Sequence, residues 1–316
     1  MGTATTWILL TLVVPAAPAL KSDRGLSKEL IDLLPEDTTA VLVLDVQRAV
    51  KSEIGAALLK VLVEDQPDDQ PIRIGDVAKD VEHIVVGQFL IDSGSGDFCV
   101  LVRLRDGSKL PKILTGLAAK DGRGAGPEKI GKRTVYSISG PNASFAQIDD
   151  RTLMLVLAMG DKKQVEESRA AAYGDREQPG PRPALRKMLS DDHADDRVVR
   201  LYGYHPTKLA HSTALVLALF GVLDSGPLVA MGEKIVSYRG GIKTGGELVE
   251  FELRITTRDA DCARELLKIY EDPPKEDPVV REFRRNTTAM REGDEVVLKG
   301  KATRAMIDRL ARDPNK

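Results

Sequence analysis

The chain has 316 residues, of which 42% are apolar and only 4% aromatic, and its 46 Lys and Arg against 48 Asp and Glu leave a formal net charge of −2. This length suits two domains or one large one, with a core built from aliphatic side chains. A near-neutral charge supplies no field that attracts nucleic acid, and scarce aromatic side chains leave few surfaces on which bases can stack, so we expect no nucleic-acid partner.

The N-terminus carries an apolar run at residues 7–20, which ends in the small-residue pattern Ala17-Pro-Ala19. A run of this length followed by polar residues is typical of a secretory signal peptide, and it is too short to span a bilayer. We therefore expect residues 1–20 to be a signal peptide and the protein to be exported to the periplasm or beyond, with no stable transmembrane insertion after processing. Residues 1–6 lack the basic residue that such signals normally carry, so an apolar N-terminal segment packed on the fold stays open.

The first half of the remaining chain alternates strand and helix patterns. Asp161, with Gln164 three residues later, forms a capping-box pattern before the last of its helices. The predicted elements in chain order are strand Ala40–Val46, helix Gln47–Glu64, strand His83–Gly87, strand Asp97–Arg105, helix Ser108–Leu117, hairpin partner Arg133–Ser139, strand Arg151–Ala158 and a helix from Asp161 to Tyr173.

The second half repeats this order, after a Pro-rich, Gly-rich and charged stretch typical of a linker. Its predicted elements are strand Val198–Tyr204, helix Thr207–Leu223, strand Lys234–Tyr238, strand Glu247–Ile255, helix Asp259–Tyr270, hairpin partner Asn286–Met290, strand Asp294–Gly300 and a helix from Thr303 to Arg312. The sequence therefore predicts an α+β fold made of two tandem β-α-β-β-α-β-β-α modules, with largely antiparallel sheets and helices on one face. We place the first module at residues 27–173, the linker at 174–186 and the second module at 187–313.

The alternation, together with the Leu-Pro-Glu-Asp-Thr-Thr stretch at residues 34–39 that leads into the first strand, resembles a broad group of exported bacterial proteins of unassigned function that are common in planctomycete genomes. The resemblance covers most of the chain after residue 20 as a pattern. It implies an exported α+β protein and supplies no catalytic residues.

The segment Ser190–Arg197 gathers four carboxylates and an imidazole, and Asp191, His193 and Asp195 are its weak candidates for a metal site. It lacks the Asp-x-Asp-x-Asp-Gly frame of a calcium loop and a second nitrogen or thiolate for zinc. It also occupies the same place as residues 34–39 in the other module, before the first strand. We therefore interpret it as a helix end and polar turn, and we expect no metal and no cofactor.

Titratable residues follow the first strand of each module, at Asp45 and at His205 beside Tyr204. A strand end is a frequent position for chemistry, and a shared cleft would bring Asp45 and His205 together as a hydrolase site. The alternative is that Asp45 caps the next helix and that Pro206 opens the other. With His211 in that helix, Asp45, Tyr204, His205 and His211 are the candidate ligand-binding residues.

The segment at residues 214–223 is apolar on every side, which indicates burial, a dimer interface or a groove for an apolar ligand. Cys99 and Cys262 are expected to be buried, unpaired thiols. Since the chain has no recognisable catalytic constellation, we predict a non-enzymatic binding or structural component whose partner is an unknown protein or apolar ligand, with homo-oligomerisation possible. A carrier of an apolar small molecule or lipid is the alternative.

Overall fold

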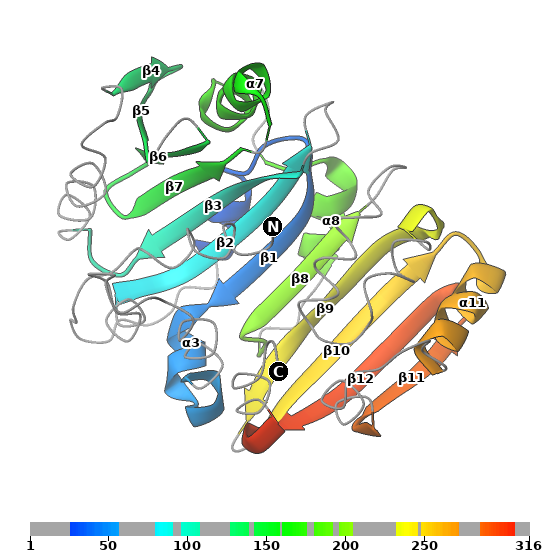
Figure 1. Cartoon of the computed structure of the whole chain (residues 1–316). Helices are drawn as coiled ribbons and strands as arrows, with labels where there is room; N and C mark the ends of the chain where they lie inside the picture. The colour runs from blue at the N-terminus through cyan, green and yellow to red at the C-terminus, as the bar shows by residue number, and fades with distance from the viewer. Residues whose placement is uncertain are drawn as a thin grey trace, which may run out of the picture. The chain divides into compact units, whose positions relative to one another are not determined.

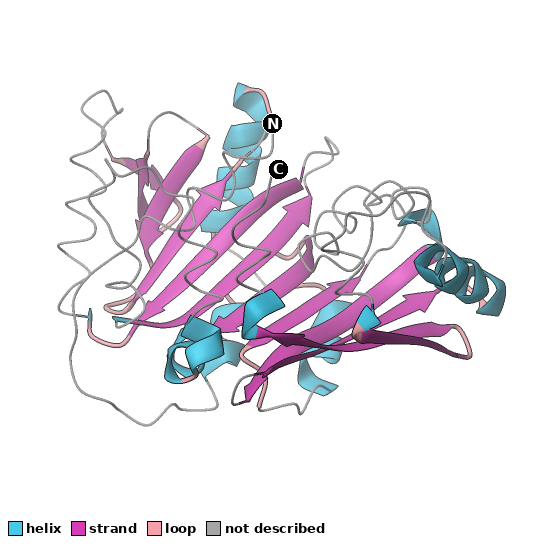
Figure 2. Cartoon of the chain, turned by 60° about the horizontal axis from the view of Figure 1, so that its bottom comes forward, coloured by secondary structure: helices cyan, strands magenta, loops and turns pink. Residues whose placement is uncertain are grey.

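The computed structural model describes residues 26–56, 80–90, 96–107, 127–138, 142–158, 160–175, 180–191, 196–204, 232–245, 248–271 and 285–306 (Figure 1). The predicted signal segment 1–20 and the predicted helices Ser108–Leu117 and Thr207–Leu223 lie outside the described residues. Figure 2 shows that strands make up most of the described chain and that helices lie against the sheets. None of the described helices has both the length and the apolar run that crossing a bilayer needs.

The chain divides into two compact units. The first unit comprises Met1–Val50 and Leu62–Arg186, and the second comprises Lys51–Val61 and Lys187–Lys316. The later boundary falls inside helix α8 (Pro183–Asp191), which begins within the predicted linker 174–186.

The first unit is built on an antiparallel sheet with the strand order β1-β2-β3-β7-β6-β5-β4. Its strands are β1 (Thr38–Asp45), β2 (Val81–Leu90), β3 (Gly96–Leu104), β4 (Glu128–Ile130), β5 (Arg133–Ser137), β6 (Ala143–Gln147) and β7 (Thr152–Leu157). The predicted hairpin between Arg133–Ser139 and the strand at Arg151–Ala158 is wrong, because β7 pairs with β6 and β3, whereas β5 pairs with β6 and β4.

Helices α2 (Leu26–Ile31) and α7 (Lys162–Tyr173) lie against one face of this sheet. Leu34, just after α2, packs so closely on β2 that a Cβ at Gly87 would lie 2.7 Å from Leu34 Cδ2. On α7, the hydroxyl of Ser168 donates to the buried carboxylate of Asp97, at the start of β3. We call the side of the sheet on which α2 and α7 lie the first face.

Helix α7 begins at the predicted capping box and is anchored to the sheet at its C-terminal end. The Asp161 carboxylate accepts from the Gln164 backbone N–H at 3.0 Å, and the Asp161 N–H donates to the Gln164 side chain at 2.9 Å, which confirms the capping box. The helix ends at Tyr173, where the phenol donates to the carbonyl oxygen of Ser144 at 2.9 Å. Burial raises the pKa of Tyr173, so this phenol stays neutral and anchors α7 to β6.

The second unit is built on an antiparallel sheet with the strand order β8-β9-β10-β12-β11. Its strands are β8 (Val199–Tyr204), β9 (Ile235–Gly245), β10 (Leu248–Thr257), β11 (Thr287–Glu292) and β12 (Glu295–Thr303), and the 3-10 helix η2 (Gly232–Lys234) precedes β9. Here the predicted hairpin partner of the last strand is confirmed as β11.

Helix α11 (Ala260–Glu271) covers the apolar face of the second sheet (Figure 1). Arg291 points to this face from β11 and donates to the Ala260 carbonyl oxygen at 3.2 Å. The buried residues Phe251, Leu253 and Ile255 alternate along β10 on the same face. Both sheets are antiparallel and combined with helices, so the predicted α+β class is confirmed.

Two details of the local predictions change. Helix α3 (Val46–Lys51) stops well before the predicted end at Glu64, and a second helical turn starts after Ser52. Neither Cys99 nor Cys262 forms a disulfide, as predicted, but Cys262 is half-buried rather than buried.

Candidate functional site

Asp45 is the predicted site residue that the structure describes most fully. It is the last residue of β1, and its Oδ1 accepts a hydrogen bond from the Arg48 backbone N–H at 2.8 Å. Its Oδ2 lies 3.6 Å from the Arg48 guanidinium. A carboxylate that binds the N–H group three residues later is an N-cap, so the capping interpretation of Asp45 is confirmed.

His83 lies beside Asp45 in the first sheet. Asp45 on β1 is directly paired with His83 on β2, and His83 is paired with Arg103 on β3. Arg103 is in turn paired with Thr152 on β7. Directly paired residues point to the same side of a sheet, so these four side chains form one row on the first face. We call this row the strand-end cluster.

The cluster places a buried imidazole between a carboxylate and a guanidinium. His83 is 5% exposed, and the side chains of Asp45 and Arg103 are 12% and 14% exposed. Burial makes any charge in this row costly unless a partner compensates it. The chemistry of the row therefore depends on which of its charged groups already have partners.

Arg103 has such a partner in Asp149. The two side chains are 2.7 Å apart, and the Thr152 hydroxyl donates to Asp149 at 2.8 Å. Burial by itself would raise the pKa of Asp149, but hydrogen bonds from the Arg151 backbone and from Thr152, and the charge of Arg103, hold the pKa of Asp149 below its ordinary value. This end of the row is thus a compensated ion pair that fixes the turn before β7.

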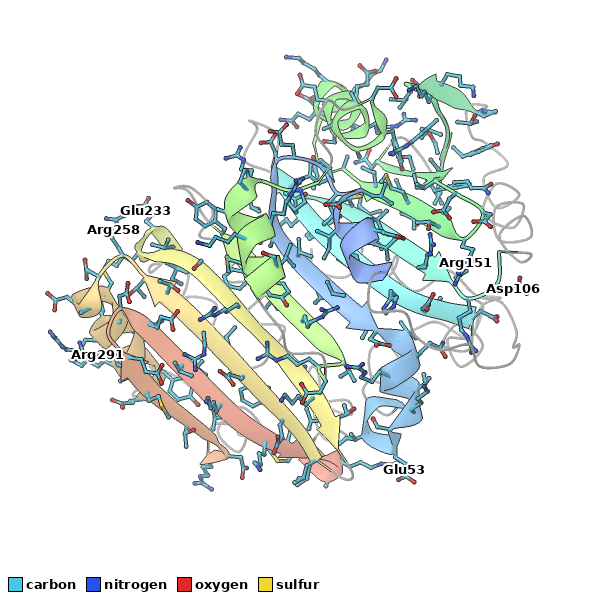
Figure 3. All side chains as sticks on the ribbon, turned by 180° about the vertical axis from the view of Figure 1, so that it is seen from behind. Glu53, Asp106, Arg151, Glu233, Arg258 and Arg291 are labelled. Carbon is cyan, nitrogen blue, oxygen red and sulfur yellow. The ribbon has the colours of Figure 1, made fainter. Side chains whose placement is uncertain are left out.

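Two further contacts tie down the same end of the sheet. Arg151 lies 2.9 Å from the Glu82 carboxylate and donates to the Leu104 carbonyl oxygen at 2.9 Å (Figure 3). Arg105 donates to the side chain of Gln47 at 3.1 Å, whose amide in turn donates to the Val81 carbonyl oxygen. The described arginine side chains of this region bind carbonyl oxygens, carboxylates and an amide of the chain itself. Their arrangement therefore indicates a structural role.

Asp45→Ala is expected to lower the free energy of unfolding by about 1 kcal/mol, because the first turn of α3 loses its capping oxygen. Asp45→Asn keeps an oxygen at the cap and should lose much less. Urea unfolding followed by circular dichroism measures both, with Asp161→Ala at the cap of α7 as a matched control of about the same size. Equal losses for Asp45→Asn and Asp45→Ala would contradict a capping role.

The other candidate residues are not brought to this cluster by the described structure. Tyr204 is the last residue of β8 in the second unit, half-buried and paired with Ser237. Asp191 ends α8, and His193, Asp195, His205 and His211 lie outside the described residues. Within the described ranges, no group of three or more His, Cys, Asp or Glu could hold a metal ion.

The outer face of the second sheet carries charged side chains in cross-strand pairs, and we call it the charged face (Figure 3). Lys301 on β12 lies 2.7 Å from Glu250 on β10, and this hydrogen bond holds the pKa of Glu250 below its ordinary value. Arg254 contacts Glu252 at 2.8 Å and Glu292 at 3.0 Å. Burial alone would lower the pKa of Arg254, but these two carboxylates raise it. Ion pairs that are exposed to this extent contribute little to stability, so the network is typical of a solvated face.

The first sheet differs, because the side opposite α2 and α7 is also apolar. Two cross-strand rows of four residues make up this side, which we call the second apolar face. The rows are Leu42–Val86–Val100–Leu155 and Leu44–Ile84–Val102–Leu153. The members from β3 and β7 are buried, whereas the four from β1 and β2 are half-buried. Sequence reasoning missed this face, although its signal was present in near-continuous apolar strands, which indicate burial on both sides.

No protein-family model matches the chain, and no curated protein matches its sequence. Three solved structures of TP0453, its crystal forms I, III and IV, align with 89% of this chain and with 94% to 96% of their own chains, at TM-scores of 0.49 and sequence identities of 10% to 11%. A likeness of this size carries no function across, and the resemblance to exported planctomycete proteins stays a prediction.

Proposed function

We propose that this protein is an exported, non-enzymatic binding component that holds an apolar ligand against the second apolar face of the first unit. The observation that carries the proposal is the pair of apolar rows across β1, β2, β3 and β7. Antiparallel sheets commonly keep one polar, solvated face, as the second unit does with its charged face. The chain already buries the members of this face on β3 and β7, whereas the half-buried residues on β1 and β2 leave apolar surface that a ligand can cover.

The polar residues of the first unit support a binding rather than a catalytic role. The carboxylate of Asp45 is engaged in capping α3, and Arg103 and Arg151 are engaged with Asp149 and Glu82. A general acid or base must reach a substrate proton. Groups that already hold the backbone and each other are better suited to stiffening the sheet that presents the apolar rows.

The two-module organisation is part of the same proposal. The strand order β1-β2-β3-β7-β6 in the first unit corresponds, position by position, to the order β8-β9-β10-β12-β11 in the second. The strands within each unit pair antiparallel. We interpret this correspondence as an internal duplication, in which one copy kept a charged face and the other acquired a second apolar one. Export of the protein, proposed from the apolar run at residues 7–20, would place such a binding surface outside the cytoplasm.

Replacing Leu42 and Val86 together by Lys is expected to weaken ligand binding strongly, because two charges would enter one apolar row. The probe is N-phenyl-1-naphthylamine, whose fluorescence rises in apolar surroundings. We expect wild-type protein to bind it and the double variant to lose at least tenfold in affinity, which is more than about 1.4 kcal/mol.

The matched control is Leu248→Lys, which replaces an apolar residue that is 38% exposed on the charged face of the second unit. It should bind the probe like the wild type. Thermal unfolding of all three proteins separates lost binding from lost structure. A wild-type protein that binds no probe, or a folded double variant that binds as well as the control, would refute the proposal.

A further inference from the structure

Two arginine side chains of the first unit lie between helix α7 and the short strands β4 and β5 (Figure 1). Arg169 belongs to α7, and its Nη2 lies 2.8 Å from the Glu128 carboxylate of β4. Arg133 is the first residue of β5, and its Nη1 donates to the Ala172 carbonyl oxygen in the last turn of α7 at 3.0 Å. Because Arg169 and Ala172 are three residues apart on one helix, both guanidinium groups lie on the same side of α7. We call Arg133 and Arg169 the arginine pair.

Arg169 is buried without full compensation of its hydrogen-bond donors. The residue is 8% exposed, and among the described residues no acceptor forms a hydrogen bond with its buried Nε. The approach of Nη2 to Glu128 is close enough for an ion pair but lacks the geometry of a hydrogen bond. The Glu128 side chain is 56% exposed, so solvent screens this pair. A buried guanidinium with an unused N–H group is costly unless an acceptor satisfies it.

Arg133 is half-buried and contacts neutral acceptors. Within the described ranges, its contacts are those of Nη1 with the Ala172 carbonyl oxygen and, at 3.5 Å, with the sulfur of Met154. Burial holds the pKa of Arg133 below its ordinary value, although neighbouring groups, among them the Asp175 carboxylate, act in the opposite direction. A guanidinium nevertheless stays protonated, so the uncompensated charge remains and attracts an anion.

The hairpin of β4 and β5 adds positive charge and is held in place beside α7. Lys129 and Lys132 are exposed on it. At its turn, Gly131 has a φ of 56°, and a Cβ there would lie 3.0 Å from the backbone nitrogen of Asp175, just after α7. Glycine at this position therefore allows the turn to approach the end of the helix. The two glutamates within α7 are ion-paired with lysines of the same helix, which leaves Glu128 as the carboxylate in contact with the arginine pair in the described structure.

We propose that the arginine pair forms a binding site for a phosphate group. A guanidinium presents its N–H groups in a planar fork that matches the oxygens of a phosphate. A phosphate offers acceptor oxygens in several directions and nearly two negative charges, so it can bind the Nε of Arg169 and the remaining donors of Arg133 together. The single carboxylate of Glu128 contacts Arg169 alone. This site lies on the first face, opposite the second apolar face, so the inference is independent of the proposed apolar ligand.

Calorimetric titration with inorganic phosphate, at an ionic strength held constant with sodium chloride, tests the site on the full chain. We expect the wild type to bind phosphate and Arg133→Gln to lose about tenfold in affinity or more, because charge-assisted hydrogen bonds are removed. The matched control is Lys163→Gln, which removes one positive charge from an exposed position of α7. It should bind phosphate like the wild type, and circular dichroism of each variant verifies its fold.

Glu128→Gln gives a second measurement that a merely structural ion pair would not produce. Its affinity for phosphate should rise about threefold, because the carboxylate that competes for Arg169 and repels the anion is gone. If the pair were only structural, this variant would lose stability and gain no binding. Phosphate binding that is weaker in Glu128→Gln than in the wild type would contradict the proposal.

Two further probes distinguish the source of the phosphate group. Binding of glycerol 3-phosphate would indicate a soluble phosphate ester. Binding only to phosphatidylcholine vesicles that contain phosphatidic acid, with loss of that binding in Arg133→Gln, would indicate a lipid headgroup. Either result supports the site. A wild type that binds none of these probes, or an Arg133→Gln variant that binds as well as Lys163→Gln, would overturn it.

Discussion

Phe145→Ala is expected to lower the free energy of unfolding by about 3–5 kcal/mol, the range for deleting a fully buried aromatic side chain. Phe145 is the central residue of β6 and is 0% exposed. It is paired with Leu155, so it extends one row of the second apolar face. Its ring also stacks on Tyr136 of β5, with the ring centroids 5.1 Å apart. Removing the ring leaves a cavity beside its neighbours on β5 and β7.

Chemical denaturation of the variant measures this loss, and Phe98→Ala is the matched control. Phe98 lies on β3 in the same sheet but is only half-buried, so its truncation should cost much less. A double-mutant cycle with Tyr136→Ala isolates the ring contact, for which we expect about 0.5–1.5 kcal/mol. Equal losses for Phe145→Ala and Phe98→Ala would show that β6 is not part of the sheet core.

The strand β6 also shows where sequence reasoning stopped short. The segment Ala143–Gln147 is five residues long, and the sequence pattern favours Arg133–Ser139 instead as the partner of β7. The Gly140-Pro141 pair between these two segments is a turn signal and would have separated two strands. Longer elements with clear alternation, such as β3 and β10, were predicted to within a few residues. Short strands carry too few residues for a period to decide between neighbours.

In the candidate site too, features that depend on neighbours in the sequence could be predicted, whereas features that depend on strand pairing could not. The caps at Asp45 and Asp161 were predictable, because a cap is decided by a residue and its neighbours three positions on. The strand-end cluster was not, because the pairing of His83 with Asp45 and Arg103 depends on the register of three strands. A shift of one residue in that register would turn His83 to the other face. The second apolar face is a different case, because near-continuous apolar strands indicate burial on both sides whatever the register.

Gly203→Ala is expected to destabilise the second unit by about 1–3 kcal/mol, the cost of overpacking a filled core. Gly203 on β8 is paired with Tyr238 on β9, and a Cβ at Gly203 would overlap the ring of Tyr238. The ring cannot move aside easily, since Tyr238 is 1% exposed. Phe251 lies over Gly300 in the same manner, so this sheet uses glycine twice to seat an aromatic ring on its apolar face.

The control for this prediction is Gly245→Ala, at the end of β9, where an added Cβ would meet no atom within 4 Å. Urea unfolding should show no loss for Gly245→Ala, while Gly203→Ala should shift the midpoint downward. Tyr238→Leu combined with Gly203→Ala should cost less than the sum of the two single changes, because the smaller side chain makes room for the methyl group. Additive losses would mean that the ring of Tyr238 is not what requires glycine at position 203. The apolar face of the second unit would then be less tightly packed than the contact between Gly203 and Tyr238 implies.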